Sequence, residues 1–205
     1  MQNKVFCIGF QKTGTTTIGE ALKVLGYRVT GPDNVRDKDI AEKVERITAA
    51  LSHRFDAFQD NPWPLVYRQM DALHPGSKFI LTVRDPQKWY ESYRNHFEGV
   101  PSTPMQEMLY GPPVDDPEHY KGCVLRHNQE VVDYFQDRPG DLLVIDLTHD
   151  HRWEPICAFL ELPVPEAPFP HSNQRKFGFL PPKTRSVLKK GWRWLGRPGA
   201  RRALR

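Results

Sequence analysis

The sequence predicts an α/β fold with a mostly parallel, doubly wound central sheet. Short β-branched or aromatic segments alternate along the chain with segments of helical periodicity, and KFILTVR (78–84) is the clearest strand among them. A glycine-punctuated turn joins the first of these strands to the first helix. Strands that alternate with helices form a parallel sheet covered on both faces, and 205 residues suffice for one such core.

The individual elements follow from periodicity and from breaking residues. The first helix has Ile18, Leu22 and Leu25 on one face and stops at Gly26, and Asp85 is placed to cap a helix with Pro86 in its first position. A proline-rich loop is expected over residues 101–117. The predicted strands are 4–9, 27–30, 55–59, 78–84 and 141–147, and the predicted helices are 15–25, 37–53, 65–73, the one after Asp85, 116–137 and 152–160.

Composition is that of a globular chain kept in a reducing compartment. Apolar residues make up 39% and charged residues 26%, no run of 18 apolar residues occurs, and the first residues lack the apolar region of a signal peptide. Three widely spaced cysteines fit neither a disulfide framework nor a zinc site. We therefore expect a cytoplasmic protein.

The net charge of +4 conceals an uneven distribution. Residues 167–205 hold 11 of the 29 Lys and Arg residues and none of the 25 Asp and Glu residues, so the preceding body is acidic. A basic tail on an acidic body is a poor indication of nucleic-acid binding, and no nucleic-acid partner is expected. The boundaries predicted on this basis are a main domain over residues 1–180 and a basic amphipathic tail, including a helix, over residues 181–205.

The segment KVFCIGFQKTGTTTIGEAL (4–22) predicts an anion-binding turn between a strand and a helix. Such a turn directs backbone N–H groups and the positive end of the helix dipole at one point. Gly9 and Gly14 have the spacing of a nucleoside-triphosphate loop, but Thr15 stands where that loop has its lysine. Lys12 lies inside the turn instead, and three threonines open the helix. The alternative is an ordinary turn with a solvated lysine.

The segment GFQKTGTTTI resembles the 5′-phosphosulfate loop of sulfotransferases that use 3′-phosphoadenosine 5′-phosphosulfate (PAPS). The resemblance implies a P-loop-like three-layer sandwich, in which Lys12 stabilises the leaving phosphate and is both a catalytic and a cofactor-binding residue. The threonines that follow would bind the 5′-phosphate. The cofactor-binding residues implied for the loop are Gln11, Lys12, Thr13, Gly14, Thr15, Thr16 and Thr17.

A second motif, VRDPQKWYESY, supplies Arg84 and Ser92. In the same family an arginine at a strand end and a serine eight residues later bind the 3′-phosphate of PAPS, which ATP lacks. Ser92 is nearly two helical turns beyond Asp85 and should return to the helix face near Arg84. A guanidinium and a hydroxyl suit a phosphate, whereas a surface salt bridge and a solvated serine are the alternative.

The resemblance covers roughly residues 4–176, including FQDNPW and PFPHSN. Family members place a histidine or a carboxylate after the third strand as the base that deprotonates the acceptor, and here that position is held by Asp60. The chain thus resembles a subgroup with a carboxylate in place of the catalytic histidine. Asp60 could instead cap a turn before Asn-Pro, and the other candidate bases are His96, His127 and His171. Arg175 and Lys176 match a late basic loop that closes over the 3′-phosphate.

Partners are less well defined by the sequence. No metal site is expected, because His149 and His151 lack a recognised metal-ligand spacing. The acceptor is expected to be a small molecule or a glycan, such as a carbohydrate or a glycolipid, with adenosine 3′,5′-bisphosphate as the second product. The basic tail, with its tryptophans, suits either an anionic membrane surface, which would make the protein peripheral to a membrane, or a helix packed on the body.

Two other functions remain open from the residues. The strand LLVID ends in Asp146, which could hold magnesium in a P-loop kinase. A non-catalytic, membrane-associated binding protein of the same fold is the other possibility. Preference for adenosine 3′,5′-bisphosphate over ATP-magnesium would favour the sulfotransferase.

Overall fold

The sheet is parallel throughout, as the sequence predicts. A computed structural model describes residues 3–149 and 151–170, all within one compact unit, Met1–Ser172. The described part of the chain has five strands in the order β2-β3-β1-β4-β5. Their bounds are β1 Val5–Cys7, β2 Val29–Thr30, β3 Ala57–Phe58, β4 Lys78–Thr82 and β5 Leu142–Ile145.

The strand order reverses at β1, which lies at the centre of the sheet. Val5 is in register with Ala57 of β3 on one side and with Lys78 of β4 on the other. In open parallel sheets, ligands bind beyond the carboxyl ends of the strands where the order reverses. The loops that follow β1, β3 and β4 therefore meet at one place.

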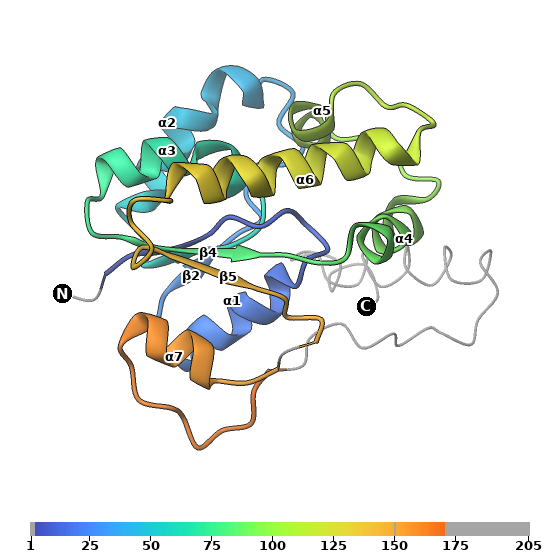
Figure 1. Cartoon of the computed structure of the whole chain (residues 1–205). Helices are drawn as coiled ribbons and strands as arrows, with labels where there is room; N and C mark the ends of the chain where they lie inside the picture. Colours follow the sequence, from blue (N-terminus) through green and yellow to red (C-terminus); the bar gives the residue numbers. More distant parts are fainter. Residues whose placement is uncertain (1–2, 150, 171–205) are drawn as a thin grey trace, which may run out of the picture. The chain divides into compact units, whose positions relative to one another are not determined.

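Helices cover both faces of the sheet and give three layers (Figure 1). Helices α1 and α7 lie on one face, α2, α3, α5 and α6 lie on the other, and α4 lies beyond the carboxyl end of β4. This confirms the α/β sandwich. The bounds are α1 Thr15–Val24, α2 Ile40–Ser52, α3 Trp63–Leu73, α4 Pro86–Phe97, α5 Pro104–Tyr110, α6 Pro117–Tyr134 and α7 Glu154–Leu160.

The alternation of side chains along β1 divides the core in two. Phe6 points into the larger half, where its ring stacks on Phe58 with 4.5 Å between centroids and on Phe79 at 5.4 Å. Val5 and Cys7 point into the other half, with residues of α1 and α7. All three β1 residues have no exposed surface, so the end of the strand is a rigid base for the loop after it.

One prediction about the elements is wrong. Within the expected proline-rich loop of residues 101–117, the structure has a helix, α5. Pro104 is its first residue, and Thr103 and Gln106 form a capping box in which each side chain bonds the other's backbone N–H. Proline therefore starts a helix here. The predicted tail and its boundary at residue 180 lie outside the described residues, and in the described part no helix is long and apolar enough to cross a membrane.

Candidate functional site

The glycine-punctuated turn after β1 has the tight geometry that its sequence predicts. A Cβ on Gly9 would collide with the side chain and backbone of Thr82, the last residue of β4. Gly14 has φ 108°, in the left-handed region, and a Cβ there would lie 3.0 Å from Leu147. Gly9 is thus required by the close approach of Thr82, and Gly14 by its positive φ, independently of any ligand.

The turn is fixed to its neighbours by hydrogen bonds at successive residues. The Thr13 hydroxyl donates to the carbonyl oxygen of Phe10 at 2.6 Å and lies 2.6 Å from the hydroxyl of Thr82. The indole N–H of Trp89 donates to the Gln11 carbonyl oxygen at 2.8 Å. Lys12, which lies between Gln11 and Thr13 in the sequence, has φ 75°. Because the backbone is held on both sides, the strained residue Lys12 is kept in one conformation.

Arg84 reaches the turn from the end of β4. Its guanidinium donates to the carbonyl oxygen of Lys12 at 3.0 Å, so the two predicted phosphate motifs, 72 residues apart, meet at one point. Ser92 lies on α4, three residues after Trp89, and side chains three apart lie on neighbouring positions of a helix surface. Its half-buried hydroxyl makes no hydrogen bond to the described part of the chain, which leaves it available to a ligand.

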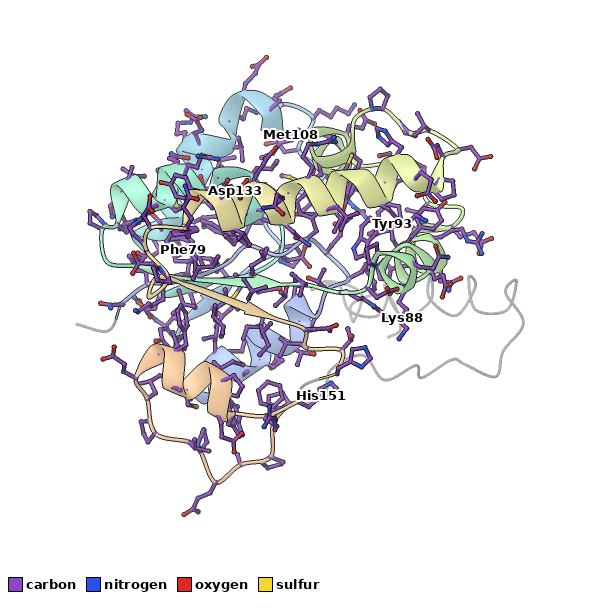
Figure 2. The ribbon with its side chains drawn as sticks, in the orientation of Figure 1. Phe79, Lys88, Tyr93, Met108, Asp133 and His151 are labelled. Carbon is purple, nitrogen blue, oxygen red and sulfur yellow. The ribbon has the colours of Figure 1, made fainter. Side chains whose placement is uncertain are left out.

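Helix α4 begins where the sequence predicts. The Asp85 carboxylate accepts a hydrogen bond from the backbone N–H of Lys88 at 2.8 Å, and Pro86 occupies the first helical position. Figure 2 shows Lys88 projecting from α4 on the side away from α6, whereas Tyr93 lies on the α6 side, where its ring contacts Tyr120. The helix is therefore anchored at its start and along one face.

Asp60 follows β3, the strand beside β1, and faces the glycine-punctuated turn. Its backbone is in the left-handed region, with φ 63°. One carboxylate oxygen accepts from the backbone N–H of Asn61 at 2.8 Å, and the other accepts from the hydroxyl of Thr15 at 2.7 Å. The Asn61 side chain donates in turn to the amide oxygen of Gln11 at 2.7 Å. The candidate base and the phosphate turn are thus one hydrogen-bonded unit.

The electrostatics of Asp60 suit a general base. Burial raises the pKa of its carboxyl, and the hydrogen bonds from Thr15 and Asn61 and the positive charge of Lys12 lower that pKa by less, so it stands above the ordinary value. A raised pKa makes a carboxylate a better proton acceptor.

The structure places the other candidate residues in different surroundings. His96 is exposed near the end of α4. His127 is buried on α6, with Nε2 2.8 Å from the carbonyl oxygen of Ile8 and its ring stacked 4.3 Å from that of Phe10. That contact and its burial, which lowers the pKa of the imidazole, are those of a structural residue. His171, Arg175 and Lys176 lie outside the described residues.

The predicted loop residues divide by what their hydroxyl or amide groups contact. The Gln11 and Thr13 side chains bond within the protein, and the Thr13 N–H also donates to Phe10 at 3.3 Å. Thr16 is exposed, whereas Thr15 and Thr17 are buried. Of the three threonines that open α1, only Thr15 has its hydroxyl bonded to another described residue.

Two residues at the site escape prediction from sequence. Asn61 connects Asp60 to Gln11, and it is 2% exposed. Tyr110, at the end of α5, is equally buried, and its pKa is raised by burial, by Tyr93 and by the charge of Asp60. Asn61 could be inferred from its position next to Asp60, whereas Tyr110 reaches the site through helix α5, which the sequence does not predict.

Asp146, the magnesium candidate of the kinase alternative, has a structural role after β5. Its carboxylate accepts hydrogen bonds from the backbone N–H of Thr148 at 2.8 Å and from the Thr148 hydroxyl at 2.6 Å. These bonds close the turn that follows the strand. Among the described residues, no group of three or more His, Cys, Asp or Glu side chains is arranged to hold a metal ion.

Comparison with known proteins agrees with this geometry. A sulfotransferase domain family matches residues 4–113 and 105–177, which together span most of the chain and include both phosphate motifs and Asp60. The chain is also similar to the Ava biosynthesis cluster protein M of Aspergillus versicolor, at 26% identity over 216 residues, covering 82% of this chain and 80% of the relative. With the fold, the turn and the family match in agreement, the chain belongs to the sulfotransferase domain family.

Proposed function

We propose that the protein transfers a sulfuryl group from PAPS to a hydroxyl or amine of an acceptor. The observation that carries the proposal is the hydrogen bond from Arg84 to the carbonyl of Lys12. It joins the residue suited to the 3′-phosphate and the turn suited to the 5′-phosphosulfate in one site. A ligand with phosphate groups at both positions fits that pairing, and ATP has no 3′-phosphate.

The residues present fit PAPS. The first backbone N–H groups of α1 lack helical partners and can donate to a 5′-phosphate. The hydroxyl of Ser92, which is unbonded among the described residues, can join Arg84 at the 3′-phosphate. When bound, PAPS supplies the sulfuryl group and leaves as adenosine 3′,5′-bisphosphate. The same cofactor role for Gly14, Thr16, Thr17, Arg175 and Lys176 is part of the proposal.

Asp60 and Lys12 have different roles in the proposed reaction. Asp60 accepts the proton of the acceptor hydroxyl as its oxygen attacks the sulfur and the bond between sulfur and the phosphate oxygen breaks. Lys12 stabilises the negative charge that develops on that phosphate oxygen. Asp60 thus acts on the attacking oxygen and Lys12 on the leaving oxygen of an in-line transfer, and the turn holds both residues in position.

Two features argue against a magnesium-dependent kinase. Thr15 occupies the lysine position of a triphosphate loop, and its hydroxyl is bonded to Asp60. Asp146 is bonded to Thr148. A site built for a triphosphate would instead present a lysine at position 15, and one carboxylate oxygen of Asp146 is already engaged in closing its own turn.

The acceptor is proposed to be a small molecule or a glycan. The Aspergillus versicolor relative is named for a biosynthesis cluster, which favours a small-molecule acceptor. Screening with radiolabelled PAPS against small-molecule and carbohydrate acceptors would identify it by transfer of label.

Calorimetry tests the proposed function without an acceptor. We expect the full chain to bind adenosine 3′,5′-bisphosphate in the presence of a metal chelator, and to bind ATP-magnesium at least tenfold more weakly. The reverse preference would favour the kinase. Absence of binding to either nucleotide would favour a non-catalytic protein of the same fold.

A further inference from the structure

Thr15 has a contact that a simple phosphate ligand would not have. It is the first residue of α1 and is 3% exposed, and its hydroxyl donates to a carboxylate oxygen of Asp60 at 2.7 Å. A threonine hydroxyl has one hydrogen to donate. While that hydrogen is on Asp60, the hydroxyl cannot also donate it to a phosphate.

The backbone of Thr15 is oriented differently from its side chain. The N–H groups of the first helical residues have no acceptor within the helix and point outward along its axis, where an anion binds. Thr15 can therefore serve two groups at once. Its amide is available to a phosphate, while its hydroxyl holds the carboxylate that follows β3.

Both oxygens of Asp60 are fixed by the protein. The N–H of Asn61 holds one oxygen at 2.8 Å, and Thr15 holds the other. Two bonds at opposite oxygens fix the plane of the carboxylate, and each oxygen keeps a further lone pair for a proton. Because Asn61 also bonds Gln11 of the turn, the orientation of Asp60 depends on the turn from both sides.

We propose that the hydroxyl of Thr15 is a positioning group for Asp60, rather than a ligand of the cofactor's 5′-phosphate. This inference rests on the proposed function, since it assigns Asp60 as the base. The proposed role distinguishes Thr15 from Thr16 and Thr17, whose hydroxyls have no such partner among the described residues. The turn thereby both binds the phosphate and orients the base.

Thr15→Val tests the proposal, because it removes the hydroxyl and keeps the amide and the branched shape. Asp60 is followed by NMR in ¹³C-aspartate-labelled full-length protein, where the resonance lost in Asp60→Asn identifies it. The titration midpoint of Asp60 should move to higher pH by about 1 unit, because a hydrogen bond to the charged form favours that form. Affinity for adenosine 3′,5′-bisphosphate should stay within about threefold of wild type.

Three further variants complete the design. Thr15→Ser keeps the hydroxyl and should restore the wild-type midpoint, and Thr15→Ala repeats the loss of the hydroxyl if the valine variant does not fold. Thr16→Val is the contrasting change one residue away: it should weaken bisphosphate binding and leave the Asp60 midpoint unchanged.

The opposite pattern would overturn the inference. If Thr15→Val weakens bisphosphate binding tenfold or more, its hydroxyl is a phosphate ligand, and if the Asp60 midpoint does not move, its hydroxyl does not position the carboxylate; either result rejects the inference. Failure of the wild-type chain to bind the bisphosphate would instead reject the proposed function itself, and the two outcomes are distinguishable in the same experiments.

Discussion

At the scale of single residues, Asp60 has the most specific environment at the site. It sits between Thr15 and Asn61 in a left-handed backbone conformation. Loops of parallel sheets often contain aspartates that cap a turn, and Asp60 does accept the N–H of the next residue. The second bond, from the hydroxyl of Thr15, distinguishes Asp60 from a simple turn cap and supports the proposed role as base.

We predict that Asp60→Asn lowers turnover by at least about a hundredfold, the usual contribution of a general base. Affinity for adenosine 3′,5′-bisphosphate should be little changed, because the amide keeps the shape of the carboxylate. Radiolabelled transfer and calorimetry measure the two effects separately. An asparagine variant with wild-type turnover would remove Asp60 from the mechanism.

The pH dependence of turnover follows from the same carboxyl. Burial raises the pKa of Asp60, and only the ionised form accepts a proton. Activity should therefore rise with pH through this raised pKa and be lost as the pH falls through it. A rate profile whose acid limb lies at the ordinary aspartate value would contradict this assignment.

The raised pKa also has a consequence for stability. The pKa of Asp60 is higher in the folded state than in the unfolded state, so the folded state holds the proton more tightly. The contribution of Asp60 to the free energy of unfolding therefore falls as the pH rises from the ordinary aspartate pKa through the raised pKa. Asp60→Asn should thus increase the free energy of unfolding at neutral pH, as measured by urea denaturation. An unchanged urea midpoint would show that the lost hydrogen bonds offset the relief of the desolvated charge, and a lower midpoint would show that they outweigh it; either result would contradict the prediction.

At the scale of elements, α4 connects the two phosphate motifs. Trp89 has no exposed surface, and its indole N–H bonds the carbonyl of Gln11 in the turn. Arg84 precedes the helix and bonds the next carbonyl, that of Lys12. The position of α4 therefore determines the shape of the turn, and loss of either bond should affect ligand binding as well as folding.

Trp89→Phe should destabilise the protein by about 1–3 kcal/mol, because it leaves a buried carbonyl without its donor. It should also weaken bisphosphate binding. Tyr90→Phe, on the same helix but half-buried, is the matched control and should change stability by less than about 0.5 kcal/mol. Urea denaturation and calorimetry measure both variants, and equal effects would refute the role assigned to Trp89.

Sequence patterns predicted the elements that local signals define. The strand at 78–82, the cap at Asp85 and the glycine turn depend on residues close in sequence, and all are found. Helix α5 does not follow from the sequence patterns, because clustered prolines ordinarily indicate a loop, although Thr103, Pro104 and Gln106 form a capping signal. The bond between Thr15 and Asp60 spans 45 residues and exists only because β3 lies beside β1, which periodicity does not reveal.

At the scale of the whole molecule, the basic residues are concentrated near the end of the sequence. The candidate site lies in the described residues, and the strongly basic segment follows them in the chain. Residues 181–205 contain nine Lys and Arg residues and no acidic residue. We propose that this segment contacts anionic membrane surfaces, because clustered basic residues with tryptophans favour them. The predicted domain boundary separates this role from the nucleotide site.

Deleting residues 181–205 should abolish co-sedimentation with vesicles that contain anionic lipid and leave bisphosphate affinity within about threefold of the full chain. Vesicles of neutral lipid provide the control, since electrostatic attraction is absent there. Equal sedimentation of the full and shortened chains would reject the membrane proposal without bearing on the sulfotransferase site.

The central claim is that one site binds both phosphates of a 3′-phosphoadenosine nucleotide. Calorimetry of adenosine 3′,5′-bisphosphate and adenosine 5′-monophosphate, on wild type, Arg84→Gln and Ser92→Ala, tests it most directly. Wild type should prefer the bisphosphate by at least tenfold, and each variant should lose most of that preference, since charge-assisted bonds to the 3′-phosphate are each worth about 1.5–3 kcal/mol. Ser92→Ala should bind the monophosphate about as tightly as wild type does, whereas Arg84→Gln, which also loses its bond to the Lys12 carbonyl, should bind both nucleotides more weakly. Equal affinity of wild type for the two nucleotides would contradict the account.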